Sequence, residues 1–341
     1  MRRIACLVAL TAMLWPIATH PAAGRTPVDV APVSIFYYPW YGTAALDGRD
    51  LHWAQRDHRP PDDIAAAFYP ARGLYSSSDP RVLDAQMADI AAAGVAEVSV
   101  SWWGRGSTED ERLGLVLAAA RRHGLTVAIH LEPYPGRSPE SAAADIALLR
   151  ILGIRTFYIY EPTDVPAEDW ARVNAQLADV TVYAETGRVG YAKRGGFAGI
   201  YTYDLMTWGP DTFSRVCAAA RASGLLCAPS IGPGYDARRG SGDQRVKPRR
   251  DGATYDAMWR AAFAAGADRV TITSYNEWHE GTQIEAATSA CRRGAFEYES
   301  YDGAYGQRGA AAQTAYLRRT AYWTHRFEVG YTALAARAQR R

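Results

Sequence analysis

Strand-like segments recur at regular intervals along the chain, and this regularity limits the possible folds more than any other feature. Each segment is a short run rich in β-branched and aromatic residues, which is the pattern of a buried strand. Eight such runs are present: residues 33–38, 95–103, 125–131, 154–160, 180–184, 198–203, 225–231 and 269–275. No internal repeat or low-complexity linker divides the sequence into separate parts.

Alanine-rich segments of helix-favouring composition separate the strands. They span residues 80–93, 109–123, 139–152, 166–178, 211–223 and 255–265, and the unit between residues 180 and 198 has the weakest helical pattern. A last segment, 310–328, predicts the closing helix with four aromatic side chains facing inward: Tyr316, Tyr322, Trp323 and Phe327. This alternation predicts parallel strands joined by right-handed crossovers, and eight such units close into a (β/α)8 TIM barrel. A doubly wound open sheet is the alternative.

The first 24 residues have the composition of a secretory signal peptide. Arg2 and Arg3 precede an apolar segment, residues 4–15, and the small residues at 22–24 offer a cleavage site. The segment is too short to span a membrane, which takes roughly 17 to 25 apolar residues. We therefore expect a secreted or periplasmic protein that consists of one barrel domain, residues 25–341, without stable membrane insertion. A leader that is retained as an anchor is the alternative.

The charge balance argues against a nucleic-acid-binding function. Lysine and arginine number 38, and aspartate and glutamate 36, for a formal net charge of +2 at pH 7. A nucleic-acid-binding domain would instead show a basic face or stripe. We expect a monomer whose partner is a small or polymeric carbohydrate, for the reasons given below.

Three cysteines follow the leader, at Cys217, Cys227 and Cys291. Because the number is odd, at most one disulfide can form within a chain. Export would permit a bond between Cys217 and Cys227 if the helix and the following strand lie close together. Burial of both as small apolar side chains is the slightly favoured interpretation.

The segment TITSYNEWHEGTQIE, residues 271–285, combines two carboxylates, a histidine and a tryptophan behind an apolar strand that should end near Tyr275. Hydrolysis of a glycosidic bond needs one carboxyl that protonates the leaving oxygen and a second that acts as base or nucleophile. If the chain turns helically after Tyr275, Glu277 and Glu280 lie on one face with Cβ atoms roughly 5–6 Å apart. They are the candidate catalytic residues. A solvated glutamate pair beside a core tryptophan is the alternative.

The barrel prediction brings the carboxyl ends of all eight strands to one mouth, where barrel enzymes bind their ligands. The residues there are rich in aromatic rings, hydroxyls and carboxylates, a lining that suits carbohydrate. Trp53 and Trp278 offer flat faces for stacking on sugar rings, and His279 could orient a carboxylate. For most single aromatic residues, core packing is the simpler interpretation. The candidate substrate-binding residues are Tyr38, His52, Trp53, Trp103, Glu132, Tyr160, Tyr201, Tyr203, Tyr235, Asn276, Trp278 and His279.

Seven motifs carry a resemblance to a known family. They are FYYPWYGT at Phe36, HW at His52, DDIAAAFYPARGLYSSSDP from Asp62, HLEPY at His130, GGFAGIYTY at Gly195, PSIGPGY at Pro229 and TSYNEWHEGTQIE at Thr273. In these motifs, and in their order over nearly the whole mature chain, the sequence resembles glycoside hydrolase family 99. That family comprises endo-α-1,2-mannosidases and bacterial endo-α-1,2-mannanases.

The resemblance implies a (β/α)8 barrel that cleaves internal α-1,2-mannosidic linkages of mannans or N-glycan-type oligosaccharides with retention, and without a metal or cofactor. It makes Glu277 the base that activates the mannose 2-hydroxyl for attack on C1, giving a 1,2-anhydro sugar. Glu280 becomes the general acid and then the general base. The residues alone would favour a direct glutamate nucleophile, the usual retaining route. Sugar contacts are implied at Tyr38, His52, Trp53, Glu132, Tyr201 and Tyr235.

Three features depart from the family's usual pattern. The stretch between HLEPY and FYIYEP is short, the sixth strand ends in YTYD with Asp204, and SWWG at Ser101 differs from several relatives. These departures affect the expected substrate more than the expected chemistry.

The basic loop, residues 236–250, carries six cations: Arg238, Arg239, Arg245, Lys247, Arg249 and Arg250. A solvated flexible loop is the usual interpretation of such a run. The alternative is a lid over the barrel mouth that meets substrate hydroxyls or phosphate groups.

Two other functions compete with a mannosidase. A carbohydrate-binding or glycan-synthesising relative would keep the mouth, although a matched acid and base favour the enzyme. A zinc hydrolase is disfavoured, because HEGTQ lacks the second histidine of HExxH, and His52, His130 and His279 have no diagnostic ligand spacing.

Overall fold

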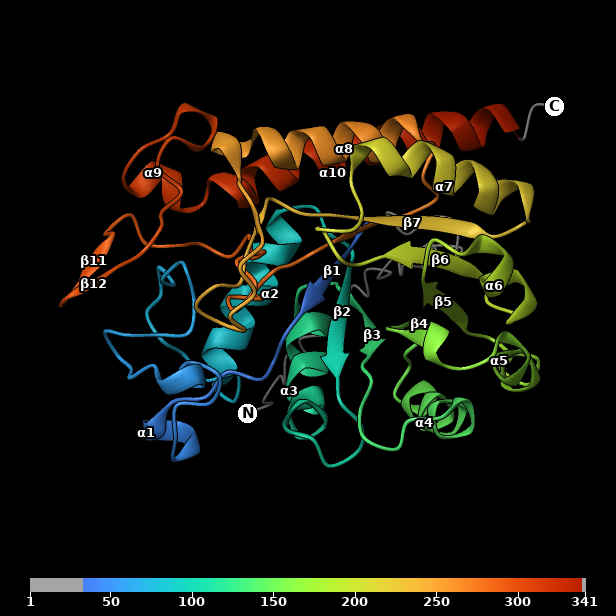
Figure 1. Ribbon diagram of the computed structural model, residues 1–341, viewed down its shortest axis with the longest axis horizontal. Helices are drawn as coiled ribbons and strands as arrows, with labels where there is room; N and C mark the ends of the chain where they lie inside the picture. The colour runs from blue at the N-terminus through green and yellow to red at the C-terminus, as the bar shows by residue number, and fades with distance from the viewer. Residues whose placement is uncertain (1–32, 339–341) are drawn as a thin grey trace, which may run out of the picture. The chain divides into compact units, whose positions relative to one another are not determined.

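The computed structural model describes residues 33–338 and contains a closed barrel of eight parallel strands (Figure 1). The strands are β1 (Val33–Tyr37), β2 (Glu97–Trp102), β3 (Thr126–Leu131), β4 (Thr156–Ile159), β5 (Thr181–Glu185), β6 (Gly199–Thr202), β7 (Leu226–Ile231) and β10 (Val270–Ile272). The barrel closes where β1 pairs with both β10 and β2, so that Ile35 lies opposite Ile272 and Val98. The prediction of a (β/α)8 barrel is confirmed, and the open-sheet alternative is wrong. The predicted signal peptide lies outside the described residues.

Helices follow the strands in the predicted positions, mostly within two residues. They are α2 (Pro80–Ala92), α3 (Thr108–Arg122), α4 (Pro139–Ile151), α5 (Ala167–Asn174), α6 (Val189–Arg194), α7 (Pro210–Ala222), α8 (Ala253–Ala264) and α10 (Ala315–Ala338). Capping explains where several begin. Asp79 accepts a hydrogen bond from the backbone of Arg81 before α2, and Ser138 forms a capping box with Ser141 before α4. Helix α6, in the weakest predicted segment, has only six residues.

Short elements occupy the loops at the barrel ends. They are α1 (Ala44–Asp47), α9 (Ala310–Gln313), the 3-10 turns η1 (Gln55–Asp57), η2 (Pro162–Asp164), η3 (Arg250–Gly252) and η4 (Ala304–Gly306), and the paired strands β8 (Tyr235–Asp236) with β9 (Val246–Lys247) and β11 (Arg292–Arg293) with β12 (Phe296–Glu297). The basic loop is therefore partly ordered by the β8–β9 pair.

Helix α10 packs along α8 through aromatic side chains. Trp323 stacks on Trp259 at a centroid distance of 6.1 Å, and Tyr316 meets Tyr255 at 6.0 Å. Tyr316, Trp323 and Phe327 are buried, as predicted, but Tyr322 is 43% exposed and the inward placement predicted for it is wrong. The Tyr322 ring instead lies beneath an arginine guanidinium on the outer side of the helix. Within the described part of the chain, no helix is both long and apolar enough to cross a membrane.

Aromatic rings fill the interior of the barrel. Phe36 on β1 contacts His130, Tyr158 and Tyr201 at centroid distances of 4.5, 5.7 and 5.9 Å. At the amino end of the strands, the buried carboxylate of Glu97 pairs with Arg269 and accepts a hydrogen bond from the Tyr158 hydroxyl at 3.2 Å. The interior is a packed core, so a ligand can reach the barrel only from the loops at its ends.

Strand β10 ends at Ile272, three residues before the predicted end near Tyr275. The reason is that the backbone turns to a new partner: Ser274 donates to the carbonyl of Thr282 at 3.0 Å and accepts from Ile284 at 2.9 Å. A turn closed by the Gly281 N–H and the Trp278 carbonyl follows, instead of the helix that was one of the predicted possibilities. The segment that carries both candidate glutamates is thus folded back on itself.

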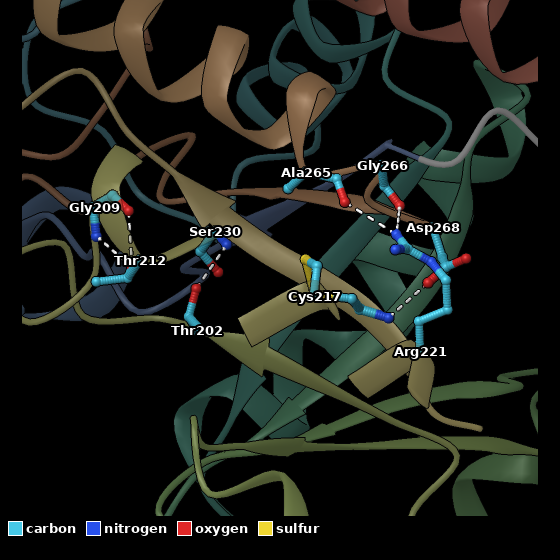
Figure 2. Close-up of a disulfide and its surroundings, with 10 residues drawn as sticks. Thr202, Gly209, Thr212, Cys217, Arg221, Ser230, Ala265, Gly266 and Asp268 are labelled. Carbon is cyan, nitrogen blue, oxygen red and sulfur yellow. Dashed lines mark hydrogen bonds between the residues drawn. A yellow bond between two sulfur atoms is a disulfide. The ribbon is translucent and has the colours of Figure 1, made fainter. Parts of the chain in front are cut away.

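A disulfide joins Cys217 on α7 to Cys227 on β7, with a Cα–Cα distance of 5.2 Å (Figure 2). The slightly favoured interpretation of two separate thiols is wrong. Helix α7 packs directly on the strand that follows it, which brings two buried cysteines ten residues apart into contact. Cys291 is exposed and free.

Candidate active site

The segment after β10 is tied to the end of β1 by a buried amide. The side chain of Asn276 accepts a hydrogen bond from the Tyr38 N–H at 2.8 Å and donates to the Tyr38 carbonyl at 3.0 Å. The Glu277 N–H donates to the Ser274 hydroxyl at 2.8 Å. These bonds fix the backbone on both sides of Asn276 and place Glu277 at the mouth of the barrel.

The two candidate glutamates occupy different electrostatic surroundings. Burial, followed by the charge of Glu280, raises the pKa of Glu277 well above its ordinary value, and the backbone N–H groups of His279 and Glu280 oppose this rise. Burial raises the pKa of Glu280 to about 7, with further contributions from the charges of Asp204 and Glu132. A hydrogen bond with Tyr203 opposes that rise. The pair can therefore retain a proton at neutral pH, as an acid catalyst requires.

His279 is a neutral imidazole whose tautomer is set by its neighbours. Its Nε2 lies 2.7 Å from the carbonyl oxygen of His52, which can only accept, so Nε2 carries the proton. Burial lowers the pKa of His279 to about 4, so the ring is uncharged at neutral pH. The remaining Nδ1 lies 3.8 Å from Glu277 Oε1, and the His279 N–H donates to the same oxygen at 3.1 Å. His279 thus faces the carboxylate, as predicted.

Aromatic residues from strands far apart in the sequence meet above the barrel core. The hydroxyls of Tyr38 and Tyr203 are hydrogen-bonded to each other, and the Tyr203 ring stacks on His130 at 5.1 Å. Tyr160 meets Tyr203 edge-on at 5.3 Å. The hydroxyl of Tyr201 lies 3.0 Å from His130 Nε2. The structure therefore brings these predicted site residues together beside Glu280.

Glu132 lies in the same wall. It is buried, accepts a hydrogen bond from the Ser101 hydroxyl at 2.8 Å, and approaches His130 Nδ1 to 3.0 Å outside a hydrogen-bonding direction. Its charge contributes to the raised pKa of Glu280. Among residues 33–338, no three histidine, cysteine or carboxylate side chains are grouped so that they could hold a metal ion.

A cavity of about 440 Å³ opens at the carboxyl ends of β4, β5 and β6. Tyr160, Glu185 and Asp204 lie in its wall, together with Trp208. Carboxylates beside aromatic rings suit the hydroxyls and apolar faces of a sugar. The cavity is next to the wall formed by Tyr160 and Tyr203, so it extends the site on the side of Glu280.

The family model described as Glycosyl hydrolase family 99 matches residues 30–329. The chain belongs to glycoside hydrolase family 99. Among curated relatives of this family 99 enzyme, a zebrafish glycoprotein endo-α-1,2-mannosidase-like protein is 32% identical, over 75% of this chain and 71% of its own. The Xenopus laevis glycoprotein endo-α-1,2-mannosidase is also 32% identical, over 78% of this chain and 72% of its own.

Solved structures agree with this membership. The family 99 endo-α-mannosidase from Bacteroides thetaiotaomicron, in complex with bis-tris propane, superposes with a TM-score of 0.79 at 30% identity, covering 89% of this chain and 99% of that one. A second structure of the Bacteroides enzyme gives 0.78 at 31% identity, over 88% and 98% of the two chains. The family 99 chain is accordingly a glycoside hydrolase with a complete barrel.

Two of the predicted stacking platforms in this family 99 enzyme are core residues. Trp53 is fully buried and stacks on Tyr41 at 4.1 Å. Trp278 is also fully buried, and its indole N–H donates to Glu285 at 3.0 Å. Neither indole has a free face, so the prediction that they stack on sugar is wrong. Trp103, at the end of β2, is 37% exposed and remains available for stacking.

His52 holds its position through its backbone. It has a left-handed φ of 62°, which turns its carbonyl toward His279, and its ring stacks on Trp40 at 4.4 Å. Burial lowers the pKa of the ring to about 3, so it is neutral. The structure places His52 beside His279 and behind Glu277, where it supports the site.

The basic loop of the family 99 enzyme lies directly on the catalytic segment. The Asp236 N–H donates to the Glu280 carbonyl at 2.7 Å, and a Cβ at Gly240 would come within 2.3 Å of the His279 carbonyl. The Tyr235 hydroxyl donates to Asp243 at 2.9 Å. The loop is therefore held on this segment at Asp236 and Gly240, while residues 244–246 are exposed to solvent, and its flexibility stays a prediction.

Most cations of the basic loop are engaged within the protein, which leaves few for phosphate groups. Arg238 pairs with Asp236, Arg239 with Asp63 and Arg245 with Asp243, while Arg249 donates to the carbonyls of Gly281 and Gln283. These contacts hold the loop against its neighbours, and whether it covers the mouth stays a prediction. Whether it also meets substrate stays a prediction.

Most residues of the cavity were not among the predicted site residues, and Glu185 and Trp208 are two of them. Glu185 lies one residue past the predicted end of the fifth strand, at residue 184, and burial raises its pKa. Trp208 packs so closely on Gly187 that a Cβ there would lie 2.1 Å from the indole. The rule that strand ends carry the site would have found Glu185, had the strand been extended by one residue. No sequence pattern singled out Trp208.

Proposed function

We propose that this enzyme cleaves internal α-1,2-mannosidic linkages of a mannan or an N-glycan-type oligosaccharide, with retention of configuration. The observation that carries the proposal is the pair of carboxyls after β10, Glu277 buried and Glu280 half-buried, of which Glu280 has a pKa of about 7. The names of relatives at 32% identity, which are glycoprotein endo-α-1,2-mannosidases, support the linkage. The aromatic wall beside Glu280 supports a sugar ligand.

The proposed reaction has two steps, as the family resemblance implies. In the first step, Glu277 takes the proton from the mannose 2-hydroxyl, whose oxygen attacks C1 and forms a 1,2-anhydro sugar. The glycosidic bond from C1 breaks, and its oxygen leaves with a proton from Glu280. In the second step, Glu280 takes a proton from water, which attacks C1 and breaks the C1–O2 bond of the anhydro sugar, and Glu277 returns its proton to the released 2-oxygen. Two inversions at C1 give retention.

The surroundings of each carboxyl support these roles. Burial and the Glu280 charge raise the pKa of Glu277, and two backbone N–H groups, of His279 and Glu280, oppose that rise and favour the ionised form that a base requires. Glu280 has the negative charges of Asp204 and Glu132 nearby, and these favour its protonated form, which an acid requires. Direct attack by Glu277 on C1 is the other retaining route.

The proposed test is product analysis on an α-1,2-branched mannan and on a glucosylated mannose oligosaccharide. Wild type should release a disaccharide whose first-formed anomer, followed by NMR, is α. Glu280→Gln should lose roughly 10²- to 10⁴-fold in rate, because it removes the general acid. Glu111→Gln, at an exposed position on α3, is the matched control and should keep full activity. Binding of both glycans without cleavage would contradict the proposal and favour a carbohydrate-binding protein.

We also propose that the enzyme is exported and acts as a monomer outside the cytoplasm. The leader composition supports export, and so does the Cys217–Cys227 disulfide, since such bonds persist in oxidising compartments. Fractionation of the native host checks this, and recovery only from the cytosol would contradict it. Size-exclusion chromatography checks the oligomeric state.

A further inference from the structure

Glu285 is a fully buried carboxylate with no role in the proposed chemistry. It closes the catalytic segment that begins at β10, five residues after Glu280. Since it has no exposed surface, it cannot touch a substrate. A buried charge of this kind is costly unless it is fully paired, so its retention needs a reason.

Four donors from four residues converge on this carboxylate. The Arg72 guanidinium donates to Oε1 at 2.8 Å and the Gln86 amide donates to the same oxygen at 2.9 Å. The Tyr75 hydroxyl and the Trp278 indole donate to Oε2 at 2.8 and 3.0 Å. A carboxylate has about four lone-pair sites, so these donors occupy all of them. Burial raises the pKa of Glu285, and the Arg72 charge and the other three donors oppose that rise. Because the four donors fill its lone-pair sites, the geometry favours the ionised carboxylate.

Two of the donors, Trp278 and Tyr75, connect Glu285 to the segment that carries Glu277 and Glu280. Trp278 stands between Glu277 and Glu280 in the sequence, and its side chain is held by Glu285 and by the Tyr75 hydroxyl at 3.1 Å. The Tyr75 hydroxyl also lies 3.4 Å from the Asn276 amide nitrogen. The carboxylate therefore reaches the residues on both sides of Glu277 through one or two hydrogen bonds.

The other two donors anchor the network to the barrel wall. Gln86 belongs to α2, whose buried face packs on the strands, and Arg72 also pairs with Asp89 on that helix at 2.8 Å. The network thus links the catalytic segment to an element that does not take part in the reaction. A rigid support of this type is what precise placement of a catalytic group requires.

We propose that Glu285 is a positioning residue whose ionised carboxylate, by holding Trp278 and Tyr75, fixes the turn that carries Glu277 and Glu280. This inference rests on the proposed function of those two glutamates. Replacing the carboxylate by an amide would put an NH₂ group against donors and release the turn. A displacement of about 1 Å can cost on the order of 10²-fold in rate.

The experiment compares Glu285→Gln with Glu97→Gln. Glu97 is a matched control, because it is an equally buried carboxylate, paired with Arg269 and Tyr158, at the opposite end of the barrel. Both variants should lose thermal stability. Only Glu285→Gln should lower kcat, by roughly 10- to 100-fold, with KM changed less than about twofold. Hydrogen exchange should rise in residues 274–285 of Glu285→Gln alone.

Several outcomes would overturn the inference. One is a wild-type kcat in Glu285→Gln, and another is an equal loss of kcat in Glu97→Gln, which would reveal a general effect of destabilisation. If wild type itself cleaves neither glycan, the proposed function fails, and unchanged exchange in residues 274–285 would then overturn the positioning role independently. If Glu285→Gln does not fold, Tyr75→Phe removes a single donor and should lower kcat in the same direction.

Discussion

The disulfide between Cys217 and Cys227 should contribute measurably to stability. The bond closes a loop between residues ten apart in the sequence. In the chain-entropy model, cross-linking ten residues removes about 9 cal/mol/K from the unfolded chain, which is about 2.7 kcal/mol at 25 °C. The double variant Cys217→Ala/Cys227→Ala should therefore lower the free energy of unfolding by about that amount. Urea denaturation of wild type and variant under oxidising conditions measures the difference.

The controls separate the bond from the side chains. Cys291→Ala should leave the free energy of unfolding unchanged, because this thiol is exposed and free. Reduced wild type should lose nearly as much stability as the double variant, and reduction should have no further effect on that variant. A change below about 0.5 kcal/mol in oxidised samples, or alkylation of Cys217 and Cys227 in unfolded wild type without reductant, would refute the reasoning.

Three further predictions concern the site. In the pH profile of kcat/KM, loss of the Glu280 proton should give an alkaline limb near pH 7. Asp204→Asn should move that limb to lower pH, because the Asp204 charge raises the pKa of Glu280. An alkaline limb that stays in place in this variant would contradict the prediction. Asn276→Ala leaves a buried backbone N–H and carbonyl unpaired and should lower the free energy of unfolding by about 2–6 kcal/mol, measured by urea denaturation. Trp103→Ala should raise KM about 3- to 10-fold without changing Tm. Trp53→Ala should instead lower the free energy of unfolding by about 3–5 kcal/mol. A raised KM with unchanged stability in Trp53→Ala would show that Trp53 stacks on sugar after all.

The periodic pattern of the sequence was sufficient to predict the barrel and all eight strands. Strand ends were less predictable where tertiary contacts decide them. The end of β10 is set by hydrogen bonds between Ser274 and the later residues Thr282 and Ile284, which no local pattern encodes. Likewise the disulfide depends on how closely α7 packs on β7, a distance that composition does not contain.

The sequence predicted which residues gather at the site better than it predicted which of their side chains are exposed to a ligand. Strand ends correctly brought Tyr38, Tyr160 and Tyr203 to one wall. The same rule could not tell an exposed indole from a buried one, because Trp53 and Trp278 follow strands in the way that sugar platforms do. Their burial comes from packing partners that belong to other loops.

The environment of each carboxyl, which spacing does not reveal, distinguishes the roles proposed for Glu277 and Glu280. The two residues are chemically identical and three positions apart, so an account based on sequence spacing alone could exchange their roles. Backbone N–H groups point at Glu277 because the turn after β10 folds back on itself. The charge of Asp204, at the end of a different strand, acts on Glu280. Each proposed role depends on the position of the turn as well as on the glutamate itself. A substitution that moves the turn should therefore impair Glu277 and Glu280 together, whereas Asp204→Asn should alter Glu280 alone.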